Sequence, residues 1–215
     1  MALTEVNDII KNAHSSSAEL GKIEKSLLGI LTSDSTRAGK QFVCRELSII
    51  GTGQSVSVLG DMLIDEETSD MARYALERIP GAAVNAALRG ALREAKGKPK
   101  IGIINSLGQR RDKRAVRALG RLVGNQDKAV ATAAAAALGQ IADSRATKAL
   151  AEAKDKATGK LQMVILDSYL RCADQLVADG NKAEALAIYK GLQKPEMPKP
   201  IRTAALTGML NAAKR

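Results

Sequence analysis

Basic side chains are the residues of this chain whose type and spacing best suggest a chemical role. Residues 96–121 contain nine lysines and arginines and a single acid. Arg114 and Arg117 are followed 31 residues later by Arg145 and Lys148. Arg121 lies four residues after Arg117 and therefore on the same face of the same helix. The five residues are Arg114, Arg117, Arg121, Arg145 and Lys148. In a repeating structure they would form two adjacent rows that can bind phosphates or an acidic protein surface.

These basic rows stop after two repeats. The matching positions are Ala83 and Ala86 in the preceding repeat, and Asn181 and Glu184 in the following one. A nucleic-acid groove usually continues further and offers aromatic side chains for base stacking, whereas only 2% of this chain is aromatic. The rows are therefore also compatible with a solvated helix face, although the net charge of +10 favours anionic partners.

Catalytic and metal-binding side chains do not gather in this sequence. The one histidine, His14, lies in a polar stretch, where we interpret it as solvated. Metal sites use several His, Cys or carboxylate ligands, and the sequence contains no such cluster, P-loop or nucleophile elbow. Cys44 and Cys172 are interpreted as core residues, several repeats apart, without a mutual disulfide. We predict a protein that uses no metal or cofactor and is not an enzyme.

A repeat of about 31 residues organises the chain. Two series of leucines step together by 29, 31 and 31 residues through the middle of the sequence, which predicts two helices in each repeat. The first series is Leu47, Leu76, Leu107, Leu138 and Leu170. The second series is Leu28, Leu59, Leu88, Leu119, Leu150 and Leu186. Ala and Leu are abundant while aromatic residues are scarce, so we expect an all-α fold.

Turn and capping residues set the expected helix boundaries. From Leu59 onward, each leucine of the second series is preceded, seven residues earlier, by a residue of a type that caps helix N-termini. Gly is the weakest of these types. The residues are Thr52, Gly81, Asp112, Asp143 and Asp179. The expected helix pairs are residues 3–32, 35–64, 68–95, 99–123, 128–155 and 160–193. A last helix over about 199–213 follows a proline-rich loop.

Four stretches resemble HEAT repeats of the short, Ala-rich kind first associated with phycobilisome lyases. The best are VATAAAAALGQIADSRATKALAEA (130–153) and IGIINSLGQRRDKRAVRALGRL (101–122). CRELSIIGTGQSVSVLGDML (44–63) and MARYALERIPGAAVNAALRGAL (71–92) continue the resemblance, which is clearest over residues 35–155. It implies a right-handed α-solenoid of about six helix pairs plus a terminal helix, in a single domain over residues 1–215. The second helices would line its concave side, and each pair would contact only its neighbours.

Enzymes built on related scaffolds need residues that this chain lacks. HEAT-like deoxyhypusine hydroxylases bind iron through repeated His-Glu pairs, and HEAT-like alkylpurine DNA glycosylases use tryptophans, whereas this chain has one histidine and no tryptophan. The resemblance to bilin lyases leaves one alternative, a subunit of a bilin-lyase-like enzyme assembly, although no residues mark a bilin pocket.

The C-terminal part departs from the regular spacing. Leu170 and Leu186 are 16 residues apart, against 12 in the four preceding repeats, which predicts an elongated repeat over residues 158–193. We expect the last helix either to cap the array or to continue into a longer protein.

The expected function is a non-catalytic scaffold that binds a protein partner through the face formed by its second helices. Binding of nucleic acid or another polyanion through the five basic residues is the main alternative. The acidic stretch 61–70, which has five acids and no base, leaves self-association open. No stretch reaches the roughly 20 apolar residues of a membrane span, and the N-terminus lacks the apolar centre of a signal peptide. We therefore expect a cytoplasmic protein, with an exported mature domain as the alternative.

Overall fold

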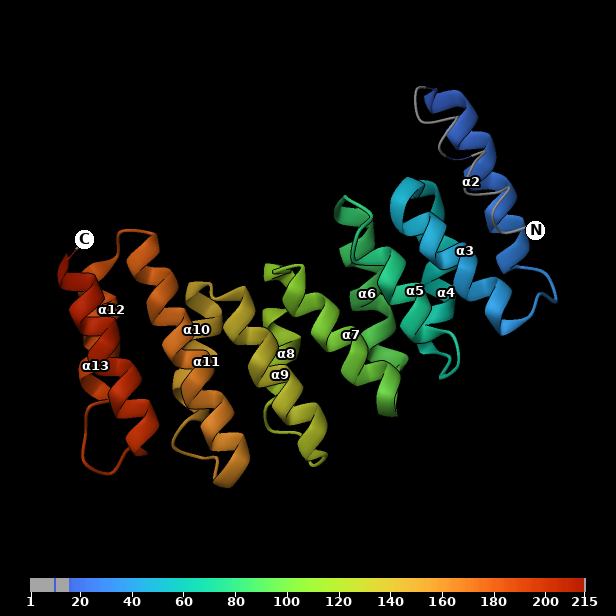
Figure 1. Ribbon diagram of the computed structural model, residues 1–215. Coiled ribbons are helices and arrows are strands. Elements are labelled where there is room, and N and C mark those ends of the chain that lie inside the picture. Colours follow the sequence, from blue (N-terminus) through green and yellow to red (C-terminus); the bar gives the residue numbers. More distant parts are fainter. Residues whose placement is uncertain (1–9, 11–15, 215) are drawn as a thin grey trace. The chain divides into compact units, whose positions relative to one another are not determined.

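The computed structural model describes residue 10 and residues 16–214. The described residues form helices joined by short turns, and no strand occurs among them (Figure 1). The chain divides into two compact units, Met1–Ser106 and Leu107–Arg215, with the division inside helix α7 (Gly97–Gln109). His14 lies outside the described residues. No helix in the described part of the chain is both long enough and apolar enough to cross a membrane.

The first unit contains two complete helix pairs, preceded by one helix. Its elements are α2 (Ser17–Leu31), α3 (Arg37–Ile50), η2 (Gly53–Ser55), α4 (Val56–Asp61), η3 (Met62–Ile64), α5 (Ser69–Leu76) and α6 (Ala82–Glu94), followed by most of α7. Helix α3 packs between α2 and α5, and α4 packs on α6. From α3 onward in this unit, first helices thus contact first helices and second helices contact second helices, as in a repeat array.

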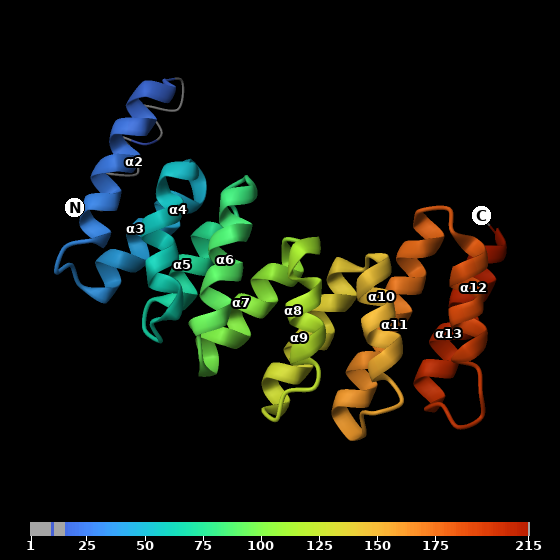
Figure 2. The same cartoon turned by 180° about the vertical axis from the view of Figure 1, so that it is seen from behind.

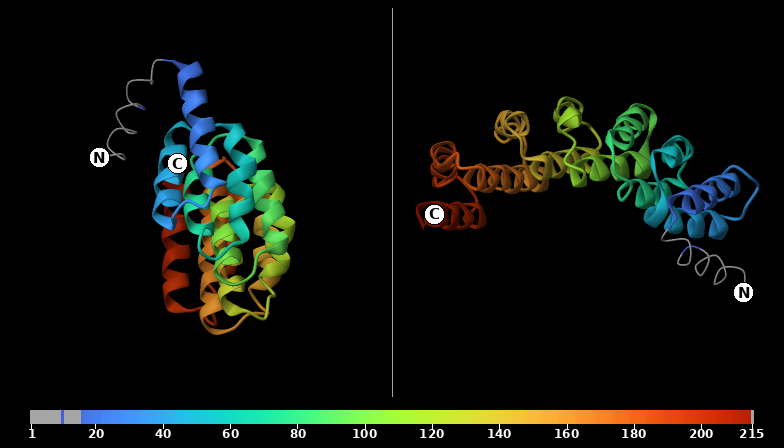
Figure 3. Two further views of the ribbon diagram at one scale, coloured as in Figure 1. Left: turned by 90° about the vertical axis from the view of Figure 1, so that its right-hand side faces the viewer. Right: turned by 90° about the horizontal axis from the view of Figure 1, so that it is seen from above.

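The second unit continues the same arrangement. After the end of α7 come η4 (Lys113–Ala115), α8 (Val116–Leu122), α9 (Lys128–Ile141), α10 (Ser144–Ala153), α11 (Gly159–Ala178), α12 (Lys182–Gly191) and α13 (Lys199–Lys214). Within this unit α9 packs on α11 and α8 on α10, so two layers form (Figures 1 and 2). Figure 3 shows α8 and α10 on one side of the layer that contains α9 and α11. The expected pairs from residue 35 onward and the last helix are confirmed, and the start of the first pair lies outside the described residues.

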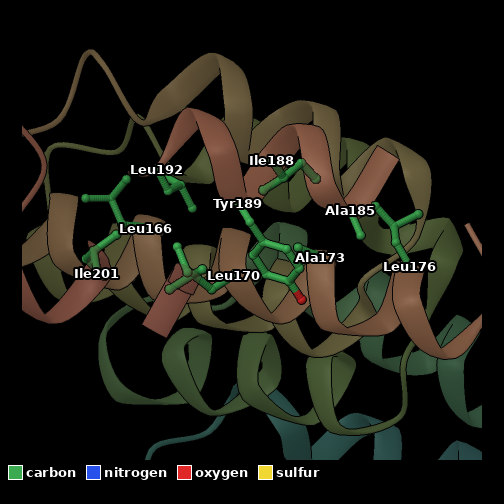
Figure 4. Packing of buried hydrophobic residues seen from close by; sticks show 10 residues of the cluster. Leu166, Leu170, Ala173, Leu176, Ala185, Ile188, Tyr189, Leu192 and Ile201 are labelled. Atoms are coloured by element: carbon green, nitrogen blue, oxygen red, sulfur yellow. The ribbon is translucent and has the colours of Figure 1, made fainter. Parts of the chain in front are cut away.

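The leucine series form the core of the repeats. Leu47, Leu76, Leu107, Leu138, Leu59, Leu88, Leu119 and Leu150 are fully buried. Leu28 and Leu186 are only partly buried. Leu186 packs against the edge of the core, to which α12 presents Ala185, Ile188 and Tyr189. In Figure 4 the Tyr189 ring lies between α11 and α12, beside Ala173. Its hydroxyl donates a hydrogen bond of 2.6 Å to Asp174, which satisfies the polar end of a buried aromatic residue.

Side-chain caps fix where the second helices begin. Thr52 accepts a hydrogen bond from the Gln54 amide, Asp112 from the Arg114 amide and Asp143 from the Ala146 amide, as predicted. These bonds satisfy amides that have no partner within their own helix. Gly81 precedes α6 with φ at 112° and provides no side-chain cap.

The predicted cap at Asp179 is wrong. Asp179 ends α11, and the following Gly180 takes the left-handed conformation, with φ at 84°. The Asn181 amide then donates to the Leu176 carbonyl at 2.8 Å, which is the hydrogen bond of a glycine-terminated helix. This turn makes α11 run to Ala178 and delays α12 until Lys182.

A buried carboxylate joins α2 to the next second helix. Glu24 is 1% exposed and accepts hydrogen bonds from the Thr52 amide at 2.7 Å and from the Ser55 hydroxyl at 2.6 Å. Because both partners lie at the start of the segment that includes η2, the carboxylate also satisfies a helix N-terminus. Glu24 therefore has a structural role between neighbouring repeats.

Candidate anion-binding groove

The five basic residues singled out in the sequence line one groove of the second unit. The groove has a volume of about 910 Å³ and lies between α8 and α10, with its far end formed by the start of α11. Seven cations and one carboxylate line it among the residues that the structure describes. The cations are Arg114, Arg117, Arg121, Lys128, Arg145, Lys148 and Lys156. All seven are exposed, so their charges face solvent.

Small residues bring the two helices of the groove together. A Cβ atom on Gly120 would lie 3.5 Å from the Cβ of Ala149, an ordinary van der Waals contact. The backbones of α8 and α10 can therefore approach closely at this point, which places their long basic side chains on facing walls. The apolar residues that line the groove and are only partly buried are Ala149, Ala153, Ala157 and Leu161.

The two walls differ in charge. On the α8 side, Arg114, Arg117 and Arg121 line the groove without any acid. On the α10 side, the exposed carboxylate of Glu152 lies between Lys148 and Lys156, four residues from each. The α8 wall is thus wholly cationic, while the α10 wall is mixed.

Arg145 has a structural role besides lining the groove. Its guanidinium forms an ion pair with Asp143 at 3.0 Å, and that carboxylate also caps α10. The same guanidinium donates to the backbone carbonyl of Lys113 at 3.1 Å and so joins α10 to the preceding repeat. By contrast, the side chains of Arg117, Arg121 and Lys148 make no ion pair or hydrogen bond with any described residue.

Two lysines of the groove were not predicted. Lys128 is the first residue of α9, and Lys156 follows the end of α10. Lys128 begins a first helix directly after a turn, and Lys156 lies in the next turn, so neither is at one of the second-helix positions that were compared across repeats. The turn after each second helix lies at the same end of neighbouring repeats. Comparing the residues in and next to these turns could therefore have predicted that Lys128 and Lys156 lie near the groove.

The acidic stretch at residues 61–70 is partly used within its own turn. Asp65 accepts hydrogen bonds from the Glu67 and Thr68 amides at 3.0 Å, and the hydrogen bond from the Thr68 hydroxyl lowers the pKa of this carboxyl. Asp70 lies 3.8 Å from the Arg37 guanidinium. These contacts give the stretch a role in shaping the turn before α5.

Both cysteines lie in the core, as predicted. Cys44 and Cys172 are 0% exposed. Burial raises the pKa of the Cys44 thiol to about 12 and that of the Cys172 thiol to about 11, because desolvation disfavours the thiolate. Both thiols are free. No group of three or more His, Cys, Asp or Glu in the described part of the chain could hold a metal ion.

Comparisons with known proteins agree with the helix arrangement. The profile of the family described as HEAT repeats matches residues 84–168, from α6 into α11. No curated protein matches the chain. The crystal structure of an engineered protein is 18% identical, covers 89% of this chain and 96% of its own, and superimposes with a TM-score of 0.52. A designed armadillo repeat protein is 16% identical over 87% of this chain and 98% of its own, with a TM-score of 0.49.

Proposed function

We propose that this chain, a HEAT-repeat protein with an all-helical solenoid fold, is a non-catalytic scaffold that binds an acidic protein partner. The binding face is that of the second helices in the second unit, at the groove between α8 and α10. One observation carries the proposal: basic residues from neighbouring repeats line a single groove, and most of them form no ion pair with an acid among the residues that the structure describes. Unpaired cations beside apolar surface favour a ligand that supplies both carboxylates and apolar groups.

Nucleic acid fits the groove less well than protein. No aromatic residue is among those that line it, so unpaired bases would find no ring on which to stack. The partly buried apolar residues Ala149, Ala153 and Leu161 offer nothing to a phosphate, and Glu152 would repel one. The mixture of surfaces therefore favours a protein ligand over a polyanion.

Cross-linking tests where a partner binds. A photo-reactive amino acid replaces Glu152, which lines the groove, and in a control chain it replaces Lys190, an exposed residue of α12. Each chain is irradiated in lysate of the native organism, and the adducts are tested for protein and for nucleic acid. We expect a discrete protein adduct at position 152 and none of the same mass at position 190. An identical set of adducts at both positions, or an adduct that contains RNA or DNA, would overturn the proposal.

The captured partner then gives a quantitative test. Its affinity is measured for wild type, for Arg117→Glu plus Lys148→Glu, and for the control Lys190→Glu plus Lys199→Glu. Both variants change the net charge equally, but only the first alters the groove. We expect at least about a tenfold loss for the groove variant, because two attractive charges become repulsive. Equal losses in the two variants would mean that net charge, and not the groove, attracts the partner.

A further inference from the structure

We infer that the groove binds an extended segment of about five residues in which carboxylates alternate with apolar side chains, and that Glu152 selects for this alternation. This inference rests on the proposed function and specifies the chemistry of its partner. It follows from three properties of the groove: its length, the spacing of the arginines on the α8 wall, and the difference in charge between the two walls.

The length of the groove limits its occupant. Arg145 and Ala153 both line it and are eight residues apart on α10, which corresponds to about 12 Å of helix at 1.5 Å per residue. An extended chain advances about 3.3 Å per residue, so five residues place their first and last Cα atoms about 13 Å apart. A short extended segment therefore spans the part of the groove that α10 lines.

The α8 wall sets the spacing of the carboxylates. Arg117 and Arg121 are one helical turn apart, about 6 Å along the helix axis, and both are exposed and form no ion pair or hydrogen bond with a residue in the described part of the chain. Alternate residues of an extended chain point to the same side and are about 6.6 Å apart. Two carboxylates at positions i and i+2 of the ligand therefore match these two arginines.

The α10 wall disfavours acids on the other side of the ligand. Side chains at i+1 and i+3 point away from α8, toward the wall where Glu152 lies between Lys148 and Lys156. Carboxylates there would meet the charge of Glu152, whereas apolar side chains can contact Ala149 and Ala153. Next to Glu152 the α10 wall thus favours apolar groups, whereas the wholly cationic α8 wall favours acids. The charge of Glu152 is therefore a repulsive element of specificity.

Three synthetic peptides test the inference with the intact chain. They carry the central sequences Glu-Leu-Glu-Leu-Glu, Glu-Glu-Leu-Leu-Glu and Glu-Ser-Glu-Ser-Glu between identical Gly-Ser flanks, and binding is measured by fluorescence anisotropy at two salt concentrations. The first two peptides have the same composition and charge, so they differ only in pattern. We expect the alternating Glu-Leu peptide to bind at least about fivefold more tightly than either of the others.

Two groove variants assign the effect to the walls. Arg117→Glu plus Arg121→Glu should weaken the alternating peptide by at least about tenfold, while Lys190→Glu plus Lys199→Glu should leave it unchanged. Glu152→Lys should remove the preference for alternation, because it makes the α10 wall wholly cationic as well. Circular dichroism spectra matching wild type show that each variant is folded.

The failures of the two proposals are distinguishable. Equal binding of the two Glu-Leu peptides, a preference that persists in Glu152→Lys, or no peptide binding at low salt would overturn the inference. In those cases cross-linking at position 152 still decides the proposed function separately. Tighter binding of a single-stranded RNA than of the alternating peptide, lost in the arginine variant, would overturn both.

Discussion

Gly139 provides a sharp test of how the first helices pack. A Cβ atom at this position of α9 would lie 2.6 Å from the Cβ and 2.8 Å from the Cα of Ser168 in α11. Such distances are well below ordinary contact, and the Cα of Ser168 cannot move by a side-chain rotation. Gly139→Ala therefore forces α9 and α11 apart.

Two effects of opposite sign determine the result. Replacing a helical glycine by alanine gains about 1 kcal/mol of helix propensity, whereas overpacking a tight interface costs about 1–3 kcal/mol. Since a backbone atom is involved, we take the cost as about 3 kcal/mol, which leaves a net loss of about 2 kcal/mol. At about 2.1 cal/mol/K per residue, a unit of roughly 110 residues should unfold about 9 °C lower.

Gly90 is the matched control. It also lies inside a helix, α6, and a Cβ there would meet no atom within 4 Å. Gly90→Ala should therefore gain stability by about 0.5–1 kcal/mol, because only the propensity changes. Thermal unfolding followed by circular dichroism measures both variants. A midpoint for Gly139→Ala that equals or exceeds wild type would refute the packing argument.

Two further predictions concern the core. Leu107→Asp and Leu138→Asp should each destabilise the chain by more than about 4 kcal/mol, because each places an unpaired charge at a fully buried position, and chemical denaturation measures the loss. Cys44 and Cys172 should resist thiol reagents at pH 8 until the chain unfolds, which a timed labelling assay can follow. Because both pKa values are raised above the ordinary 9.0, the unfolded thiols ionise first, so stability should fall as the pH rises from about 9 toward 11.

The sequence predicts the helices well where local signals and long-range spacing agree. The caps at Asp112 and Asp143 and the leucines seven residues after them define the start and the buried face of α8 and α10 independently. In a repeat protein each helix pair packs mainly on the neighbouring pairs. A correct repeat register therefore also predicts which helices are in contact. The five basic residues therefore came together as their register predicted.

The prediction is wrong where the register changes. Between Leu170 and Leu186 the spacing grows, and the left-handed turn at Gly180 shifts α12 relative to the preceding second helices. The buried face of α12 then begins at Ala185 instead of Leu186. The groove lysines Lys128 and Lys156 were missed because neither lies at a second-helix position that was compared across repeats.

The charged side chains of the groove are exposed and lie outside the core, so substitutions of these charges and of core residues should affect binding and stability differently. Arg117 and Lys148 are exposed and, unlike Arg145, form no ion pair or hydrogen bond with any residue that the structure describes. Placed among other cations, they repel their neighbours, and this repulsion opposes folding at low salt.

Arg117→Glu plus Lys148→Glu should therefore not destabilise the chain. Exposed substitutions usually change stability by about 0.5 kcal/mol or less each, and here the reversal also replaces repulsion by attraction. We expect a thermal midpoint equal to wild type or a few degrees higher at low salt, with the difference shrinking as salt is added. A midpoint lowered as far as that of Gly139→Ala would mean that these charges stabilise the fold. The claim that they are available to bind a partner would then be refuted.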